Sequence, residues 1–151
     1  MDTTTPPPSI VELSPGETEA LLRAHHVGRI AFSWRDRVDV EPIHYVYDDG
    51  AVYARTSPGT KLLTLRHSPW VAFEVDEVHG LYEWRSAVVH GAVYVVRPDG
   101  RPAERETYAR ALALLRTLEP AALTADDPVP WRNVLFRISV GRMRGRRAMA
   151  G

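Results

Sequence analysis

One lysine lies among hydroxyl groups near the middle of the chain. Lys61 is the only lysine among the 19 lysines and arginines. It follows Thr56 and Ser57, where the pattern predicts a strand over 52–56, a turn and a short helix over 58–67. A helix N-terminus presents free N–H groups and a favourable dipole to an anion, and hydroxyl and ammonium groups add further donors. An isolated lysine is usually an exposed surface residue, but this combination predicts a phosphate-binding site.

A proline interrupts a second strand that would lie close to this lysine. Residues 38–47 alternate between apolar and polar, as a half-buried strand does. Pro42 has no N–H for a ladder hydrogen bond, so it belongs at a sheet edge, a bulge or a place where a ligand approaches the backbone. An edge strand is the simpler explanation. A flat ligand against the backbone of Glu41, Pro42 and Ile43 explains the same residue.

Three further groups of residues are candidates for binding or catalysis. Trp84 and Ser86 share one face of a strand predicted over 83–96, where they could line a cofactor pocket or belong to the core. His44 is the only histidine beside the suspected ligand site; it could meet a substrate, although packing at a subunit boundary is the simpler role. The basic C-terminal end is either solvated or a binding surface for anions.

Several kinds of chemistry have no support in the sequence. None of the histidines has the i, i+4 spacing of a helical metal site, so no metal is expected. There is no cysteine, no defensible Ser-His-Asp set, no phosphate-binding loop of the Walker type and no Rossmann glycine pattern. Chemistry carried by a bound cofactor is therefore favoured over catalysis by side chains alone.

Composition restricts the setting in which the protein works. The chain has 151 residues, 44% hydrophobic and 25% charged, with a formal net charge of zero. A neutral chain is not typical of nucleic-acid binding, and no apolar run approaches the ~20 residues that span a bilayer. No signal peptide is visible, so we expect a cytoplasmic protein with neither nucleic-acid nor membrane partners.

The pattern of elements predicts a mainly β (α+β) domain. Residues 1–13 form a proline-rich leader expected to be flexible, and residues 14–147 form one domain that begins with a helix capped by Ser14. A second long helix is predicted over 103–118, and loops over 78–82 and 119–130. Hairpin connections indicate an antiparallel barrel of six strands with flanking helices. The six predicted strands are 29–34, 38–47, 52–56, 70–75, 83–96 (with a bulge or bend at Gly91) and 134–140.

The order of these features resembles a known family. The chain is similar to the pyridoxamine 5′-phosphate oxidase-like flavoproteins, which have the FMN-binding split barrel, and within them to the nitroimidazole-resistance-like branch. The resemblance implies a six-stranded antiparallel split β-barrel and a homodimer that holds FMN in a groove at the subunit interface. The stretches that carry the resemblance are 27–32, 40–50, 52–56, 61–71, 84–91, 136–140 and 143–146.

The same resemblance assigns cofactor contacts to particular residues. The phosphate of FMN would be held by Arg55, Thr56, Ser57 and Lys61, with Thr60 beside them among the cofactor residues. The backbone of Glu41, Pro42 and Ile43 would lie along the isoalloxazine ring. The other flavin contacts would come from Trp84, Arg85 and Ser86, and from Trp131 and Arg146 in the closing segment.

These expectations lead to three functional hypotheses. The first is an FMN-dependent oxidoreductase that acts on a small-molecule substrate. Vitamin B6 oxidation is not expected, because Thr60 stands where pyridoxamine-phosphate oxidases proper have a basic residue. The second is a reductase with the same fold that uses a deazaflavin, whose longer anionic tail the basic C-terminus could accommodate. The third is a flavin-binding or haem-binding protein without catalytic activity.

Overall fold

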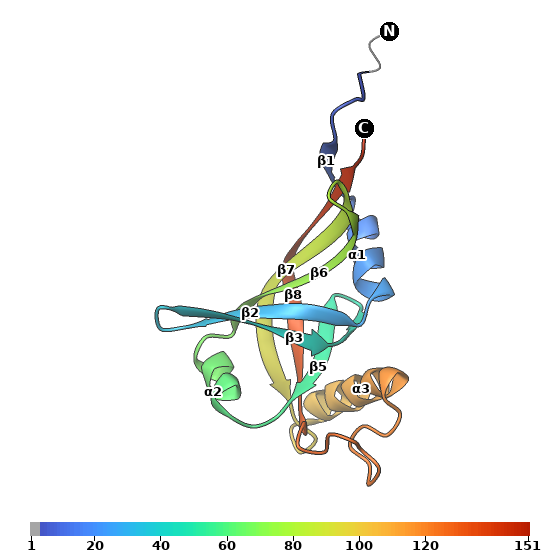
Figure 1. Ribbon diagram of the computed structural model, residues 1–151. Coiled ribbons are helices and arrows are strands. Elements are labelled where there is room, and N and C mark those ends of the chain that lie inside the picture. Colours follow the sequence, from blue (N-terminus) through green and yellow to red (C-terminus); the bar gives the residue numbers. More distant parts are fainter. Residues whose placement is uncertain (1–3) are drawn as a thin grey trace.

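The structure is a computed structural model that describes residues 4–151, apart from the side chain of Thr60. Eight strands in these residues form one antiparallel sheet, with three helices at its margins (Figure 1). The hydrogen-bonded order is β3-β2-β6-β7-β8-β5-β4, and β1 pairs with β8. The strands are β1 (Ser9–Glu12), β2 (Val27–Trp34), β3 (Arg37–His44), β4 (Val46–Asp48), β5 (Ala51–Thr56), β6 (Trp70–Gly80), β7 (Glu83–Val96) and β8 (Val134–Met149).

The predicted split-barrel class is confirmed, but the sheet is open and has eight strands rather than six. One additional strand arises because the chain turns at Tyr45, between β3 and β4. The N–H group of Tyr45 donates to the carbonyl of His26 at 2.9 Å, and its hydroxyl donates to the carbonyl of Leu22 at 2.7 Å. Its ring is fully buried against Phe73, with 4.8 Å between ring centroids. These contacts divide the single strand predicted over 38–47.

The other additional strand is β1, which lies within the predicted leader 1–13. Ser9–Glu12 pairs in register with residues 146–149 of β8, and Arg144 forms an ion pair with Glu12. Residues 1–3 of the predicted leader lie outside the described residues, and the domain boundary itself stays a prediction. Figure 1 shows that this ribbon of β1 and the end of β8 extends away from the rest of the sheet.

Two strands are longer than the sequence pattern indicated. β6 continues to Gly80, so most of the loop predicted over 78–82 is strand, and only Leu81 and Tyr82 form the turn. β8 continues through the arginine-rich end to Met149, beyond the strand predicted over 134–140. Much of these extensions is exposed, which is why the apolar alternation that marks a buried strand is missing there.

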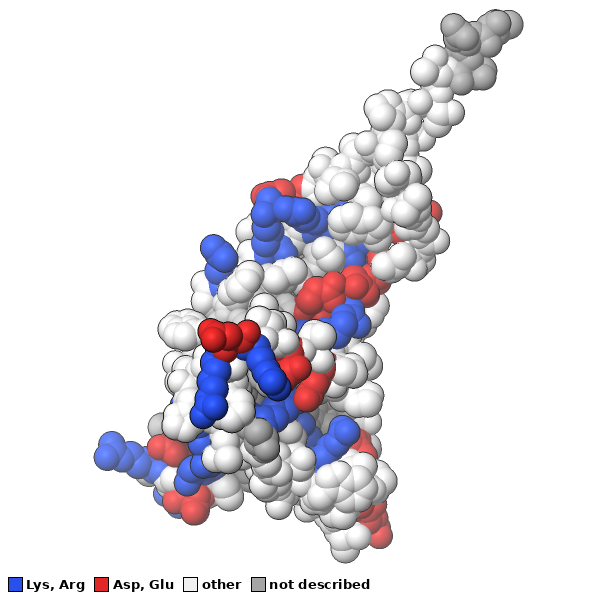
Figure 2. All heavy atoms as spheres, turned by 60° about the vertical axis from the view of Figure 1, so that its left-hand side comes forward, with Lys and Arg blue, Asp and Glu red and all other residues white. Residues whose placement is uncertain are grey.

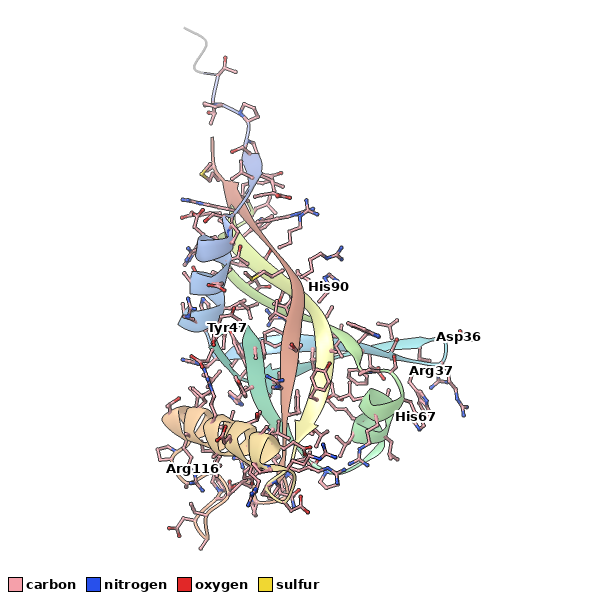
Figure 3. All side chains as sticks on the ribbon, turned by 180° about the vertical axis from the view of Figure 1, so that it is seen from behind. Asp36, Arg37, Tyr47, His67, His90 and Arg116 are labelled. Carbon is pink, nitrogen blue, oxygen red and sulfur yellow. The ribbon has the colours of Figure 1, made fainter. Side chains whose placement is uncertain are left out.

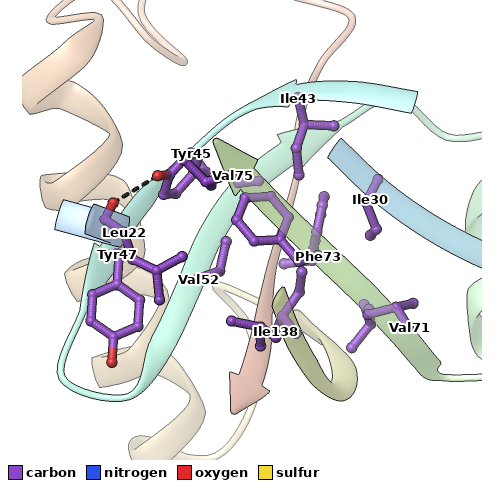
Figure 4. Packing of buried hydrophobic residues seen from close by; sticks show 14 of the residues in the cluster. Leu22, Ile30, Ile43, Tyr45, Tyr47, Val52, Val71, Phe73, Val75 and Ile138 are labelled. Atoms are coloured by element: carbon purple, nitrogen blue, oxygen red, sulfur yellow. Dashed lines mark hydrogen bonds between the residues drawn. The ribbon is translucent and has the colours of Figure 1, made fainter. Parts of the chain in front are cut away.

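Three helices cover the margins of the sheet: α1 (Pro15–Ala24), α2 (Thr60–His67) and α3 (Pro102–Leu118). α1 begins with the predicted capping box, in which the Ser14 hydroxyl accepts from the Glu17 N–H and the Glu17 carboxylate accepts from the Ser14 N–H. α3 packs against β5 and β8 through a small cluster that includes Ala111 and Leu115. The main core lies among the strands of the sheet, and it includes Leu21 and Leu22 of α1 and Leu65 of α2 (Figure 4).

The bulge or bend predicted at Gly91 is a bulge whose extra residue lies on the paired strand β8. The register with β8 shifts there, because His90 pairs with Arg142 while Gly91 pairs with Val140, which leaves Gly141 as the extra residue on β8. A Cβ atom built on Gly91 would lie 2.0 Å from the carbonyl oxygen of Ser139, so the two backbones approach more closely than any side chain allows. The bulge thus bends the β7–β8 pair at the centre of the sheet.

We expect Gly91→Ala to lower the free energy of unfolding by about 2 kcal/mol or more, because a fixed backbone atom must move to admit the methyl group. Gly16→Ala is the matched control, since nothing lies within 4 Å of a Cβ atom there. In helix α1 that change should be neutral or stabilise by at most about 1 kcal/mol. Chemical denaturation measures both. Equal effects from the two changes would contradict the close approach at Gly91.

Candidate functional site

A polar pocket of 340 Å³ lies where β3, the end of β5, the start of α2 and the loop before β8 meet. Seven of the residues predicted to bind a cofactor line it, together with His44, the candidate for meeting a substrate. They are joined by residues that the sequence pattern did not indicate. The pocket is lined by Glu41, Pro42, Ile43, His44, Arg55, Thr56, Ser57, Pro58, Gly59, Lys61, Glu119, Val129 and Arg132.

Hydrogen-bond donors gather at the end of this pocket where β5 passes into α2. The half-buried Thr56 and Ser57 contribute hydroxyl groups directly before the helix. Gly59 caps α2 without any side-chain hydrogen bond, and the first backbone bond of the helix runs from the Leu63 N–H to the Gly59 carbonyl at 3.2 Å. The N–H groups of the first turn therefore have no acceptor within the helix. Such a terminus suits a phosphate or carboxylate group.

The ammonium group of Lys61 stands at the edge of the same pocket. Its Nζ lies 2.5 Å from a carboxylate oxygen of Glu41 and 5.9 Å from the ring centroid of Phe32. The Lys61 side chain is 18% exposed and that of Glu41 is 46% exposed, so the cation is the better sheltered partner. Because an ammonium group has three donors and Glu41 occupies one of them, Lys61 retains donors for a ligand.

Arg55 also lines the pocket, but carboxylates already occupy its guanidinium. Its two terminal nitrogens bond to Asp127 at 2.7 and 3.1 Å, and one of them also bonds to Glu119 at 2.5 Å. The Arg55 side chain is only 9% exposed and that of Asp127 is fully buried. The guanidinium of Arg55, followed by the N–H groups of Leu123 and Val129, holds the pKa of Asp127 well below its ordinary value.

The remaining predicted cofactor residues lie elsewhere on the chain. Trp84, Ser86 and Arg146 line a separate pocket of 550 Å³ on the β7–β8 ribbon, and this pocket shares no lining residue with the first. Trp131 is 60% exposed and lines neither pocket. The side chain of Thr60 lies outside what the structure describes. One chain therefore does not bring all of the predicted cofactor residues together.

Arg85 is on the opposite face of β7 from Trp84 and Ser86, and it belongs to an ion-pair cluster. Its guanidinium bonds to Glu77 at 2.8 Å, and the other oxygen of Glu77 lies 2.6 Å from Nε2 of His25. Arg85 first, and then His25, lower the pKa of Glu77 to about 2. This cluster fixes the β6–β7 pair to the end of α1 and occupies Arg85 within the chain.

A further cavity of 680 Å³ adjoins the first pocket and shares Glu41 and Lys61 with it. It is formed by the β2–β3 hairpin and α2, and Figure 3 shows Asp36 and Arg37 at the hairpin tip on the same side as His67 of α2. Acidic and basic side chains mix on the face that Figure 2 turns forward, in keeping with the neutral chain. Lys61 thus lines both the polar pocket and this adjoining cavity.

Within residues 4–151 there is no cluster of three or more histidine, cysteine, aspartate or glutamate residues that could hold a metal ion. None of the helices in this range is both long enough and apolar enough to cross a bilayer.

Comparison with known proteins identifies what this architecture is similar to. The sequence profile of the family described as pyridoxamine 5′-phosphate oxidase matches residues 14–147. No curated protein sequence matches the chain. Among solved structures, an FAD-binding protein from Mesorhizobium loti is 28% identical with a TM-score of 0.74, and the match covers 93% of this chain and 99% of that one.

Two further solved structures show the same fold at lower identity. An FAD-binding protein from Mycobacterium smegmatis is 24% identical with a TM-score of 0.65, covering 91% of this chain and 99% of its own. The other is a structure from Bacteroides thetaiotaomicron that is described as a 5-nitroimidazole antibiotic resistance protein. It is 15% identical with a TM-score of 0.71, and the match covers 95% of this chain and 90% of that one.

The ion pair between Arg55 and Asp127 leads to a pH-dependent prediction. Because folding lowers the pKa of Asp127, its charge stabilises the fold above about pH 4, and that contribution is lost as the pH falls toward the lowered value. Asp127→Asn should therefore lower the melting temperature markedly near neutral pH, and the difference from the native protein should shrink as the pH falls below about 4.

Thermal unfolding at a series of pH values measures this difference. Asp126→Asn is the matched control, because the neighbouring Asp126 is exposed and only its backbone N–H takes part in a hydrogen bond. The control should change the melting temperature little at any pH. A difference for Asp127→Asn that is the same in acid as at neutral pH would contradict the charged pair.

Proposed function

The chain belongs to the pyridoxamine 5′-phosphate oxidase family, and from this premise we propose that it binds a flavin nucleotide, FMN, and serves as an oxidoreductase for a small-molecule substrate. The observation that carries the proposal is the polar pocket at the start of α2. There Thr56 and Ser57, which carry hydroxyl groups, and Lys61, which carries an ammonium group, line one space together with Gly59, the N-cap of a helix that has no side-chain capping bond. This set of donors fits a phosphate group.

The wall next to these donors fits the rest of a flavin. β3 is the last strand in the pairing order, so its outer edge leaves backbone groups without a ladder partner, and Pro42 lies in this strand. Glu41, Pro42 and Ile43 line the pocket alongside Thr56 and Ser57. A flat polar ring along this edge would find backbone donors and acceptors, while its phosphate end reached the start of α2.

A homodimer completes the proposed site. The pocket of one chain, at 340 Å³, is at the lower end of the range for sites that enclose a small molecule. The residues that it lacks, Trp84, Ser86 and Arg146, line a pocket of 550 Å³ elsewhere on the same chain. In a symmetric dimer each of two equivalent sites can combine the phosphate pocket of one chain with the β7–β8 face of its partner. The FAD-binding relative of 28% identity supports the flavin assignment.

The groups around the pocket suggest separate roles for the flavin and for the side chains. A bound flavin supplies hydride or electron transfer, which no side chain of the pocket can provide. Thr56, Ser57 and Lys61 would anchor the phosphate, and the β3 edge would orient the ring. Indole and guanidinium groups from the partner would cover the ring and exclude water. His44 lines the same pocket and is the side chain placed to meet a substrate.

Lys61→Gln tests the phosphate anchor. Loss of a charge-assisted hydrogen bond should weaken FMN binding by about 1–3 kcal/mol, which is roughly 5- to 150-fold in Kd, and should leave riboflavin binding nearly unchanged because riboflavin has no phosphate. Quenching of flavin fluorescence measures both. Arg66→Gln, a charge removal at an exposed position of the same helix, is the control and should change neither. Unchanged FMN affinity in Lys61→Gln would place the phosphate elsewhere.

Complementation between subunits tests the shared site. Lys61→Gln and Arg146→Gln should each weaken FMN binding when present in both chains. In a heterodimer with one change on each chain, one site carries both changes and the other carries none. We therefore expect half of the sites to bind FMN with native affinity. Co-expression with two different affinity tags isolates the heterodimer, and the absence of a native-affinity class would contradict a site built from two subunits.

A further inference from the structure

A buried side chain, that of Asp127, connects the loop before β8 (residues 119–133) to the phosphate pocket. Asp127 lies in the middle of this loop with its side chain fully buried. Its carboxylate accepts the N–H groups of Leu123 at 2.8 Å and Val129 at 3.0 Å, so it organises the loop around itself. The same carboxylate takes two hydrogen bonds from Arg55 at the end of β5. The loop and the strand are therefore joined by a buried charge pair.

Arg55 contacts this loop at three points along its length. Besides Asp127 in the middle, it bonds to Glu119 at the start at 2.5 Å and to the carbonyl of Arg132 near the end at 3.4 Å. These bonds occupy both terminal nitrogens of a side chain that is 9% exposed. Arg55 is thus arranged to hold the loop, and little of its guanidinium is left for a ligand.

Arg132 has the opposite arrangement, with a fixed backbone and an uncommitted side chain. Its N–H donates to the carbonyl of Val129 at 3.0 Å, and its carbonyl accepts from Arg55. Arg132 is exposed and lines the pocket together with Thr56, Ser57 and Lys61. Within residues 4–151 its guanidinium has neither an ion-pair partner nor a hydrogen-bond partner.

The ion pairs around the pocket contain more carboxylates than cations, so an anionic ligand would need a further cation. Arg55 faces two carboxylates, those of Asp127 and Glu119, and Lys61 faces Glu41. Without Arg132, the three carboxylates outnumber the two cations in these ion pairs, and this excess of negative charge would weaken the binding of a phosphate that carries nearly two negative charges. A guanidinium presents a planar fork of donors that matches phosphate oxygens and keeps its charge at any working pH.

We propose that Arg132 is the second cation of the phosphate-binding pocket, and that Arg55 is the positioning residue that holds the loop carrying Arg132 at the pocket. The proposal rests on the proposed function, in which this pocket takes the phosphate end of a flavin nucleotide. It also reassigns Arg55, which the sequence resemblance placed directly on the phosphate. Direct contact passes to Arg132, and the effect of Arg55 on binding is transmitted through the loop.

Arg132→Gln is the first test, with FMN and riboflavin as the two probes. We expect the Kd for FMN to rise roughly 5- to 150-fold, the Kd for riboflavin to stay the same, and Arg132→Lys to restore part of the loss. The melting temperature without flavin should not change, since the side chain has no protein partner. Arg105→Gln, at an exposed position of α3, is the matched control. Unchanged FMN affinity in Arg132→Gln would overturn the proposal.

A double-mutant cycle tests the positioning role of Arg55. Arg55→Gln alone should weaken FMN binding and speed amide hydrogen exchange across residues 119–133, whereas Arg132→Gln should leave that exchange unchanged. If Arg55 acts through Arg132, then adding Arg55→Gln to Arg132→Gln should cost little further FMN affinity. Fully additive losses would mean that Arg55 contacts the phosphate itself and would overturn this part of the proposal.

Measuring flavin binding by the native protein distinguishes failure of this proposal from failure of the proposed function. If native protein binds FMN while Arg132→Gln binds it equally well, the flavin assignment stands and the role of Arg132 is wrong. If native protein binds neither FMN nor riboflavin, the proposed function fails, and the role given to Arg132 fails with it.

Discussion

A buried ion pair between Arg55 and Asp127 holds together the pocket on which the proposed function depends. It joins the end of β5 to a loop that lies more than sixty residues further along the chain. Both side chains are largely or wholly removed from water, and backbone N–H groups complete the hydrogen bonding of the carboxylate. A buried pair of this kind is costly to break, because the partner left behind keeps an uncompensated charge. The pair therefore holds the loop before β8 against β5, and both elements contribute residues to the pocket.

The local charge arrangement is compatible with the proposed anion site in a neutral chain. The overall charge is zero, yet most cations near the pocket are matched with carboxylates, as Lys61 is with Glu41. Affinity for a phosphate then depends on oriented donors and on the few cations that have spare bonding capacity, rather than on a broad basic surface. Such a site favours one compact dianionic group over extended polyanions. In this respect the pocket differs from the arginine-rich face of β7 and β8, which is lined by Arg142, Arg144 and Arg146. In the proposed dimer, that face would act from the partner chain.

The sequence allowed us to predict that Thr56, Ser57 and Lys61 share one pocket with β3, because these residues are close in sequence. Thr56, Ser57 and Lys61 follow one another across a strand–helix junction, and the hairpin from β4 to β5 keeps this junction near β3. The partners of Arg55 could not be predicted in the same way. Asp127 and Glu119 lie in a loop without periodicity, and only the tertiary fold brings them to β5. For the same reason, the sequence did not indicate that Arg132 lines the pocket.

In the proposed function, a phosphate pocket at the start of α2 anchors a flavin nucleotide. The most direct test titrates the native protein with FMN and, separately, with riboflavin, following flavin fluorescence and the visible absorbance spectrum. We expect saturable binding of one FMN per chain and markedly weaker binding of riboflavin, because only FMN can use the pocket donors. Equal affinity for the two flavins, or no binding of either, would contradict the proposed function.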